Sequence, residues 1–315
     1  MLAIALILDA ILGEPNWAWK RVPHPAVLMG RLIGWFDRTL NRGDMRRAKG
    51  VVTLVLSIIV VWFFARLLSL DIFFGVFEVV GAAILLAQRS LMDHVKAVAA
   101  ALGLSLDFGR TEVAKIVGRD TATLDEPGIA RAAIESAAEN FSDGVVAPAF
   151  WFVLLGLPGM AIYKLVNTAD SMIGYRTERY EEFGWASANL DDLLNWIPAR
   201  LSAALIVLGS VLRKRDRWGD GFVAAFSSRF DAVMEDAPQH RSPNAGWPEA
   251  ATAYALDIAL SGPRIYEGEE TMDPFVNEDG EQALKRTDIV ETVQILWRSW
   301  GAMLAIVIIA TVLFT

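Results

Sequence analysis

The chain has 315 residues, of which 54% are hydrophobic and 21% charged, and its mean hydropathy is +0.37. Soluble domains average about 45–50% apolar residues even when glycine is counted, so the excess indicates segments buried in lipid or in an unusually large core. A net charge of -8 disfavours nucleic acid as a partner. Because the chain has no cysteine, the sequence excludes disulfides, a thiolate nucleophile and Cys-ligated zinc.

The apolar segments predict a chain that enters a membrane repeatedly. In chain order they cover about residues 2–13, 51–68, 72–87, 145–166, 199–212 and 295–314. A spanning helix needs roughly 20 mostly apolar residues, with about 17 tolerated, so 51–68 and 72–87 predict a transmembrane hairpin. The preceding "RTLNRGDMRRAKG" is rich in Arg and Lys, which predicts that this end of the hairpin faces the cytoplasm.

The polar insert over 88–144 is expected to be helical, because its apolar residues recur three and four positions apart. Its last helix is expected to begin at Asp125 or Glu126, with Pro127 at an early helical position and Gly144 as its stop. The last helix of the insert is therefore expected to end directly before the next apolar segment.

Segment 145–166 contains "GLPG" at 156–159, which favours a break into two half-length helices. Such a broken helix is tolerated at membrane depth where protein or water covers its backbone. We expect 145–166 to be re-entrant and 199–212, which is short and followed by the basic "RKRDR", to be shallow as well. A single crossing of 145–166 is the alternative, and it would place its flanking polar residues on opposite sides of the membrane.

The remaining part, over 213–290, is rich in Gly, Pro and acids and predicts a polar loop region. The predicted fold class is all-α, a polytopic integral membrane helical bundle with re-entrant or broken helices and cytoplasmic helical loops. We expect one membrane-embedded domain over 1–315.

The stretch "ESAAENFSDG" places acids four residues apart, so that they share one helix face directly before an apolar segment. Acids near a helix C-terminus oppose the helix dipole, which favours a functional role over a solvated face. Glu139, Asn140 and Asp143 lie nearest the apolar segment and are the favoured residues. Glu135, two turns earlier, is expected to belong to a solvated face only.

Three further polar stretches flank the apolar segments. In "NTADSMIGYR", Asn167 and Asp170 offer oxygen ligands of the kind that Mg²⁺ prefers, and Arg176 suits a phosphate; a helix cap and turn would use the same residues. In "NLDDLLNWIPARL", Asp191, Asp192 and Asn195 suit a hard cation, although a capped helix start is equally consistent. In "HRSPNAGWP", Ser242 and Asn244 are either turn residues or part of a binding loop.

Together these stretches resemble one family. "LDAILGEP", "HPAVLMGRLIG", "GRDT", "ESAAENFSDGVVAPAFW", "NTADSMIGYR", "YEEFGWASANLDDLLNWIPARL" and "SPNAGWPEAATAYAL" are similar, in one consistent order, to motifs of the CbiB/CobD adenosylcobinamide-phosphate synthases. The resemblance covers about residues 8 to 268. It implies a multi-pass enzyme of the inner (cytoplasmic) membrane, with its active site facing the cytoplasm, that joins adenosylcobyric acid to (R)-1-aminopropan-2-yl phosphate, or to aminopropanol, by an ATP-dependent amide ligation.

The resemblance also implies roles for individual residues. Catalytic roles fall to Glu139, Asp143, Asp170 and Asp192. Magnesium would be held by Asp143, Asp170 and Asp192. Substrate or phosphate binding falls to Asn140, Asn167, Arg176, Arg200, His240, Ser242 and Asn244. ATP and Mg²⁺ are the expected substrate and activating ion, with no tightly bound cofactor. The expected partners are the corrinoid, aminopropanol phosphate, the lipid bilayer and other late cobalamin-pathway membrane enzymes, without nucleic acid.

Two other functions are also consistent with the sequence. A membrane transporter with carboxylates at the midplane would also use broken helices, although the chain shows no two-fold repeat. A non-catalytic member of the same family would retain the same fold.

Overall fold

The structure is a computed structural model that describes residues 1–15, 19–70, 75–213, 221–262, 264–266, 269–271 and 273–314. It confirms an all-α membrane helical bundle. Within the described residues, the helical stretches that are long and apolar enough to cross a membrane are Arg46–Leu68, Glu126–Ile173, Trp185–Leu212 and Arg286–Phe314. The start of the predicted segment 72–87 and most of the basic "RKRDR" lie outside the described residues.

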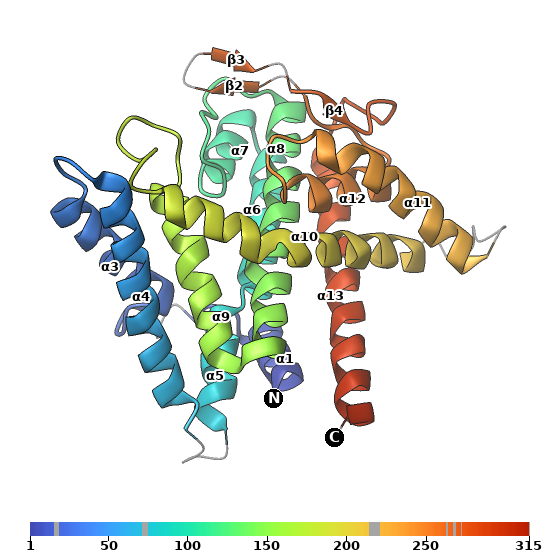
Figure 1. Ribbon diagram of the computed structural model, residues 1–315. Helices are drawn as coiled ribbons and strands as arrows, with labels where there is room; N and C mark the ends of the chain where they lie inside the picture. Colours follow the sequence, from blue (N-terminus) through green and yellow to red (C-terminus); the bar gives the residue numbers. More distant parts are fainter. Residues whose placement is uncertain are drawn as a thin grey trace. The chain divides into compact units, whose positions relative to one another are not determined.

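The chain divides into two compact units. The first comprises Met1–Arg89 and Asp143–Pro198, and the second comprises Ser90–Ser142 and Ala199–Thr315. The helices that begin in the first unit are α1 (Leu2–Leu12), α3 (Pro25–Leu40), α4 (Arg46–Leu68), α5 (Val76–Leu85), α6 (Gln88–Leu102), α9 (Ala147–Ile173) and α10 (Trp185–Arg213) (Figure 1). Helices α6 and α10 continue into the second unit. The prediction of a single domain stays a prediction.

The second unit is built mainly from helices. They are α7 (Leu106–Val113), α8 (Glu126–Phe141), α11 (Phe222–Asp236), α12 (Gly246–Leu256) and α13 (Arg286–Phe314), with a short 3-10 turn, η4 (Ala237–Gln239). Two antiparallel strand pairs complete it, β1 (Leu260–Ser261) with β4 (Phe275–Val276) and β2 (Arg264–Tyr266) with β3 (Glu269–Thr271). The prediction of a loop region over 213–290 is therefore corrected, because α11 carries apolar residues at helical spacing and α12 buries a run of alanines.

The predicted transmembrane hairpin of 51–68 and 72–87 is also corrected. Helix α4 is long enough to cross a membrane, but α5 has 10 residues, Val76–Leu85, which makes it only about 15 Å long. The chain leaves α5 at Leu86 in an extended conformation. A buried acid then starts the next helix: Asp9 of α1, 4% exposed, accepts a hydrogen bond from the Gln88 amide at 2.9 Å. Asp9 thus has a capping role.

Helix α8 begins as predicted but does not stop where predicted. The Asp125 carboxylate accepts a hydrogen bond from the Gly128 amide at 2.9 Å, which caps the helix. The chain passes through Gly144 in a π-helical turn, η2 (Ser142–Val146), and continues as α9. Gly144 instead permits a close approach, because its carbonyl accepts from the Ala87 amide at 3.1 Å and a Cβ would lie 3.3 Å from the Ala87 side chain.

Helix α9 is broken at Gly156, within the predicted "GLPG" break. Gly156 adopts φ 66° and ψ -161°, a conformation that is essentially restricted to glycine. The second half begins at Leu157, whose amide donates to the Glu78 carboxylate of α5 at 3.3 Å. Pro158 lies in the first turn of that half. Amides in the first turn have no acceptor within the helix, so the missing N–H of proline costs no hydrogen bond there.

The two halves of α9 fold back on one another (Figure 1). The Asn167 amide donates to the Asp143 carboxylate at 3.2 Å, and the Tyr163 hydroxyl donates to the Asp143 carbonyl at 3.3 Å. Asp143 and Asn167 are 24 residues apart, and a straight helix would separate them by about 36 Å. The two halves of α9 therefore form a helical hairpin, and a single straight helix over 145–166 is excluded.

The segment predicted as a short run over 199–212 is part of a much longer helix. Helix α10 runs from Trp185 to Arg213 and includes Pro198 in its interior. Because the stretch before Pro198 is helical, the buried polar residues Asp191 and Asn195, four positions apart, lie on one face. The expectation of a short apolar segment is thus corrected to a helix long enough to cross a membrane.

Replacing Gly156 with alanine tests the break in α9. The Gly156→Ala variant should be destabilised by about 1–3 kcal/mol, because this backbone conformation is strained for alanine. In addition, the alanine Cβ would lie 3.1 Å from the Glu78 carboxylate. Unfolding of the detergent-solubilised protein by a denaturing detergent measures the change. Gly301→Ala in α13 is the control, since nothing lies within 4 Å of its Cβ position. Equal stability of both variants would contradict the assigned strain.

Candidate functional site

A polar network joins the α9 hairpin to the first half of α10. The Asn167 amide lies between two carboxylates, 3.2 Å from Asp143 Oδ2 and 3.4 Å from Asp191 Oδ1. The Asn195 amide donates to Asp191 Oδ2 at 2.9 Å, and the Tyr163 hydroxyl donates to Asn195 Oδ1 at 2.8 Å. We call these five residues the hairpin network.

The hairpin network is closed on one side and open on the other. Tyr163 is fully buried, and Asn195 and Asp191 are 2% and 8% exposed, so these three hold a fixed arrangement. Asp143 and Asn167 are partly exposed. Because a buried carboxylate needs hydrogen bonds to offset its lost hydration, the amides of Asn167 and Asn195 explain how Asp191 can stay inside the helix pair.

Further charged residues of the sequence prediction surround the network in the first unit. Asp170 is partly buried and interacts electrostatically with the exposed Asp192, which in turn attracts the exposed Arg176. Asp170 also packs closely on the end of α9, because a Cβ at Gly174 would clash with its carboxylate. The first unit therefore gathers carboxylates, an amide and an arginine beside the hairpin.

Sequence reasoning underrated some members of this network. The sequence indicates Asp191, Asp192 and Asn195 as residues that suit a hard cation, and Asp192 is the one predicted as a site residue. The four-residue spacing of Asp191 and Asn195 is the signal for a shared buried face. Tyr163 and Lys164 were missed altogether, although both interrupt an apolar run. Lys164 is partly buried and lies in the electrostatic field of Asp143 and Asp191.

In the second unit, the prediction that Glu135 belongs to a solvated face is wrong. Glu135 is 5% exposed and forms an ion pair with Arg119 at 3.1 Å. Its other carboxylate oxygen accepts from the Ser261 amide at 2.8 Å. The reason is that α8 is covered on this face by the polypeptide near β1 as well as by Arg119, which a periodicity argument on α8 alone does not reveal.

A chain of buried polar groups extends from this ion pair to His240. The Ser261 hydroxyl donates to Glu249 at 3.1 Å, and the other Glu249 oxygen lies 3.7 Å from His240 Nε2. His240 Nδ1 lies 3.0 Å from the Ser242 amide, and Nε2 faces Glu249. His240 is thereby fixed in orientation by Glu249 and its own turn.

The remaining predicted residues of the second unit lie at its helix ends. Glu139 and Asn140 are exposed on the last turn of α8, where the Asn140 amide donates to the Ser136 carbonyl at 2.8 Å. The Ser242 hydroxyl accepts from the Asn244 and Ala245 amides at 3.3 and 3.2 Å, ahead of the first turn of α12. Asn244 is 7% exposed.

Arg200 lies in α10 and is partly exposed. Its guanidinium group is stacked over the Trp247 ring, 4.4 Å from the ring centre. A guanidinium held on an aromatic face keeps its donors in a fixed plane, so Arg200 is positioned to present them to a planar or anionic group.

The predicted site residues are thus divided between the units. Asp143, Asn167, Asp170, Arg176 and Asp192 belong to the first, and Glu139, Asn140, Arg200, His240, Ser242 and Asn244 belong to the second. Across the described part of the chain, no cluster of three or more His, Cys, Asp or Glu side chains is arranged to hold a metal ion.

Comparison with known proteins decides the family. The sequence profile of the family described as CobD/Cbib protein matches residues 2–296. This chain belongs to the CobD/CbiB family. The motifs that suggested the resemblance, and the residues of the hairpin network, all fall within the matched range.

Close relatives within the CobD/CbiB family cover nearly the full chain. Cobalamin biosynthesis protein CobD of Sinorhizobium sp. is 46% identical over 318 residues, which cover 98% of this chain and 96% of that protein. The proteins of the same name from Brucella suis and Rhodobacter capsulatus are 44% and 42% identical, covering 99% and 100% of this chain and 96% and 98% of their own lengths. No solved structure matches the chain.

Breaking the buried ion pair of this CobD-family chain tests the assigned role of Glu135. Arg119→Ala should destabilise the protein by about 3 kcal/mol, because it leaves a buried carboxylate without its cation. The double variant Arg119→Met/Glu135→Gln should recover most of that loss, since the glutamine oxygen still accepts from Ser261. Denaturant titration in detergent micelles provides the free energies.

The exposed pair Lys115–Glu112, whose side chains are 54% and 29% exposed, supplies the control. Lys115→Ala should change the free energy of unfolding by less than about 1 kcal/mol. An Arg119→Ala variant as stable as Lys115→Ala would show that the buried pair is not what holds Glu135 in place.

Proposed function

We propose that the chain is a membrane enzyme of cobalamin biosynthesis that ligates adenosylcobyric acid to (R)-1-aminopropan-2-yl phosphate, or to the free amino alcohol, with consumption of ATP. The product is an amide, adenosylcobinamide phosphate in the first case. The observation that carries the proposal is membership of the CobD/CbiB family over nearly the whole chain, together with relatives named for cobalamin biosynthesis.

The chemistry of an amide ligation requires activation of a poor electrophile. Transfer of the ATP γ-phosphoryl group to the corrinoid carboxylate gives an acyl phosphate and ADP. The amine then attacks the acyl carbon, phosphate leaves, and the ammonium proton passes to a base. This sequence calls for carboxylates that accept a proton or bind cations, and for cationic donors that face phosphate oxygens.

The residues of the first unit suit these tasks. Asp143 and Asp170 are carboxylates that are partly buried yet reachable, which is the setting in which a base can meet an ammonium group. Arg176 is exposed beside Asp192, so its planar donors are available to a phosphate. Asn167, held between two carboxylates, is in a position to orient an amide arm of the corrinoid. Glu139 and Asn140 remain proposed contributors from the second unit.

The loop before α12 and the stacked arginine supply further proposed contacts. Arg200 would face phosphate oxygens, and His240, Ser242 and Asn244 would bind the polar groups of the substrates. Because His240 is already oriented by Glu249 and Ser242, we assign it a role in shaping the loop as well as in binding.

Magnesium fits the donor set without a preformed protein cage. Mg²⁺ is usually held by one or two carboxylates together with substrate phosphates, and the described residues contain no cluster of three or more metal-ligating side chains. Asp143, Asp170 and Asp192 are the carboxylates that would hold it when ATP is present. When bound, the ion supplies charge that screens the phosphate oxygens.

Reconstitution tests the proposed reaction. Purified protein in nanodiscs, supplied with adenosylcobyric acid, the amine, Mg²⁺ and ATP, should form the amide, detected by mass spectrometry together with ADP. Asp143→Asn and Asp170→Asn should each lower the rate by at least about 100-fold, the lower end of the loss typical of a missing acid-base group. Asp44→Asn, an exposed acid in the loop before α4, is the matched control and should keep full activity.

One outcome would count against the proposed reaction, and another against the proposed site alone. Absence of both amide and substrate-dependent ATP turnover in folded protein would refute the ligase assignment. Full activity of both Asp143→Asn and Asp170→Asn would leave the reaction in place but refute the site. Carboxylate-dependent ion uptake by sealed vesicles that contain the same protein, without any amide formation in nanodiscs, would instead support a transporter with a broken helix.

Single cysteines test the proposed orientation toward the cytoplasm. Since the native chain has none, Thr177→Cys and Ser228→Cys, both at exposed positions, report one site each. We expect a membrane-impermeant maleimide to label both only from the cytoplasmic side, because the reaction draws on cytoplasmic ATP. Labelling of Thr177→Cys from the opposite side of intact cells would contradict this orientation.

A further inference from the structure

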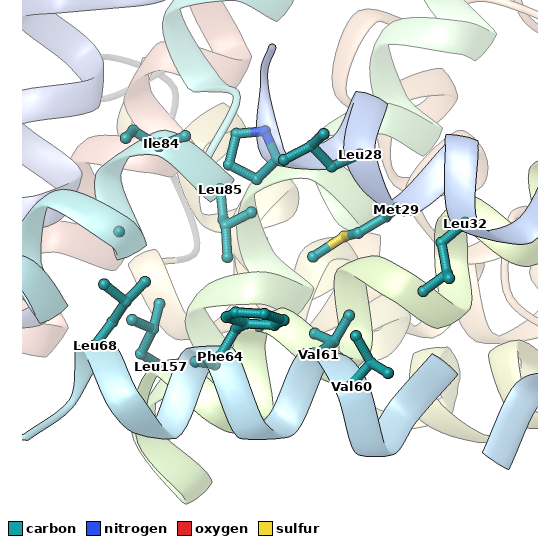
Figure 2. Close-up of a pocket in the computed structure, with 14 residues that line it drawn as sticks. Leu28, Met29, Leu32, Val60, Val61, Phe64, Leu68, Ile84, Leu85 and Leu157 are labelled. Atoms are coloured by element: carbon teal, nitrogen blue, oxygen red, sulfur yellow. The ribbon is translucent and has the colours of Figure 1, made fainter. Parts of the chain in front are cut away.

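The first unit contains an apolar cavity of about 450 Å³ that the proposed chemistry does not use. Residues from α3, α4, α5 and α9 line it, and Figure 2 shows Met29 and Leu85 facing Phe64 across it. Its boundaries include Leu28, Met29, Val61, Phe64, Leu85 and Leu157.

The lining excludes the polar substrates of the proposed reaction. Every one of the 14 residues around the cavity is apolar, and the thioether sulfur of Met29, a weak acceptor, is the one hydrogen-bonding atom among their side chains. Binding sites for phosphates or amides combine apolar walls with a few placed polar groups. An apolar space without such groups accepts hydrocarbon, and this volume is within the range of cavities that hold whole ligands, about 300–1,000 Å³.

The surroundings of the cavity identify the source of that hydrocarbon. One wall belongs to α4, which is long and apolar enough to cross a membrane and of which only 22% of the apolar window is buried inside the protein. At the rim, Phe64 is 59% and Leu28 48% exposed. Exposure of such side chains to water would be unfavourable, so the rim is continuous with the lipid-facing surface of α4.

We propose that this cavity is a binding site for one acyl chain of a membrane phospholipid, which enters from the lipid-facing side between α3 and α4. The chain lies against Phe64 and Val61 and reaches the base of the cavity at Met29 and Leu85, which are 7% and 6% exposed.

The acyl chain would also contact the second half of α9. Leu157 and Ala161, in the cavity wall, begin the second half of α9, which continues to Tyr163 and Asn167 of the hairpin network. A lipid that fills the cavity therefore stabilises the hairpin in its folded form by mass action. This inference does not depend on the proposed reaction, because it rests on the cavity and on α4 alone.

Photolabelling tests the site. The full-length protein is reconstituted into phosphatidylglycerol vesicles that contain a phospholipid with a diazirine in the middle of one acyl chain. We expect label on the Met29 and Leu85 side chains themselves, which lipid surrounding the protein does not reach because both are buried. Val61→Trp, which adds bulk inside the cavity, should reduce labelling of these residues about tenfold, a change that corresponds to a loss of about 1.4 kcal/mol in binding free energy.

Val55→Trp is the matched control, because Val55 lies on the same helix, is 48% exposed and is not part of the lining. It should leave the labelling of Met29 unchanged. Label confined to exposed residues of α4 in the wild-type protein would overturn the proposal, and this readout does not depend on the folding of any variant. A crosslink from a photoreactive amino acid at Val61 to a protein, rather than to lipid, would equally overturn it and would identify the cavity as a helix-docking groove.

Discussion

The arrangement of the first unit depends on a single backbone event, the reversal of α9 at Gly156. It requires a glycine because φ is positive and ψ is near -161°, and it leaves the first amides of the returning helix without helical partners. Glu78 of α5 supplies one acceptor at Leu157. With the reversal in place, Asp143 and Asn167 come within hydrogen-bonding distance, and Asp191 can join them from α10.

Local signals in the sequence were sufficient to predict features that are determined by a few neighbouring residues. "GLPG" predicted the break, Asp125 predicted the start of α8, and hydropathy predicted α4 and α13, because each of these is decided within a few residues. Gly144 was misread for the opposite reason. A glycine that ends a helix and a glycine that admits a neighbouring backbone look the same in sequence, and only the contact with Ala87 separates them.

The residues whose environment the sequence did not predict are those whose partners lie far away in the chain. Glu135 looked like a solvated acid until Arg119 and the Ser261 amide were found against it. Asp191 and Asp192 are adjacent and chemically identical, yet the helical turn places one at 8% exposure inside the network and the other in solvent. A pattern on one helix establishes which residues share a face, but the identity of what packs on that face comes from segments far away in the chain.

The capping contacts of the first unit also imply an order of assembly during synthesis. Asp9 is synthesised before Gln88, whose amide donates a hydrogen bond to it, and Glu78 is synthesised before its donor Leu157. Each helix start therefore finds its carboxylate already in place as the chain emerges, consistent with folding that proceeds from the N-terminal side. Glu135 is different, because the Ser261 amide that it accepts from is 126 residues downstream. The interior of the second unit must therefore wait for almost the whole chain, whereas the α9 hairpin can form as soon as its own second half has been translated.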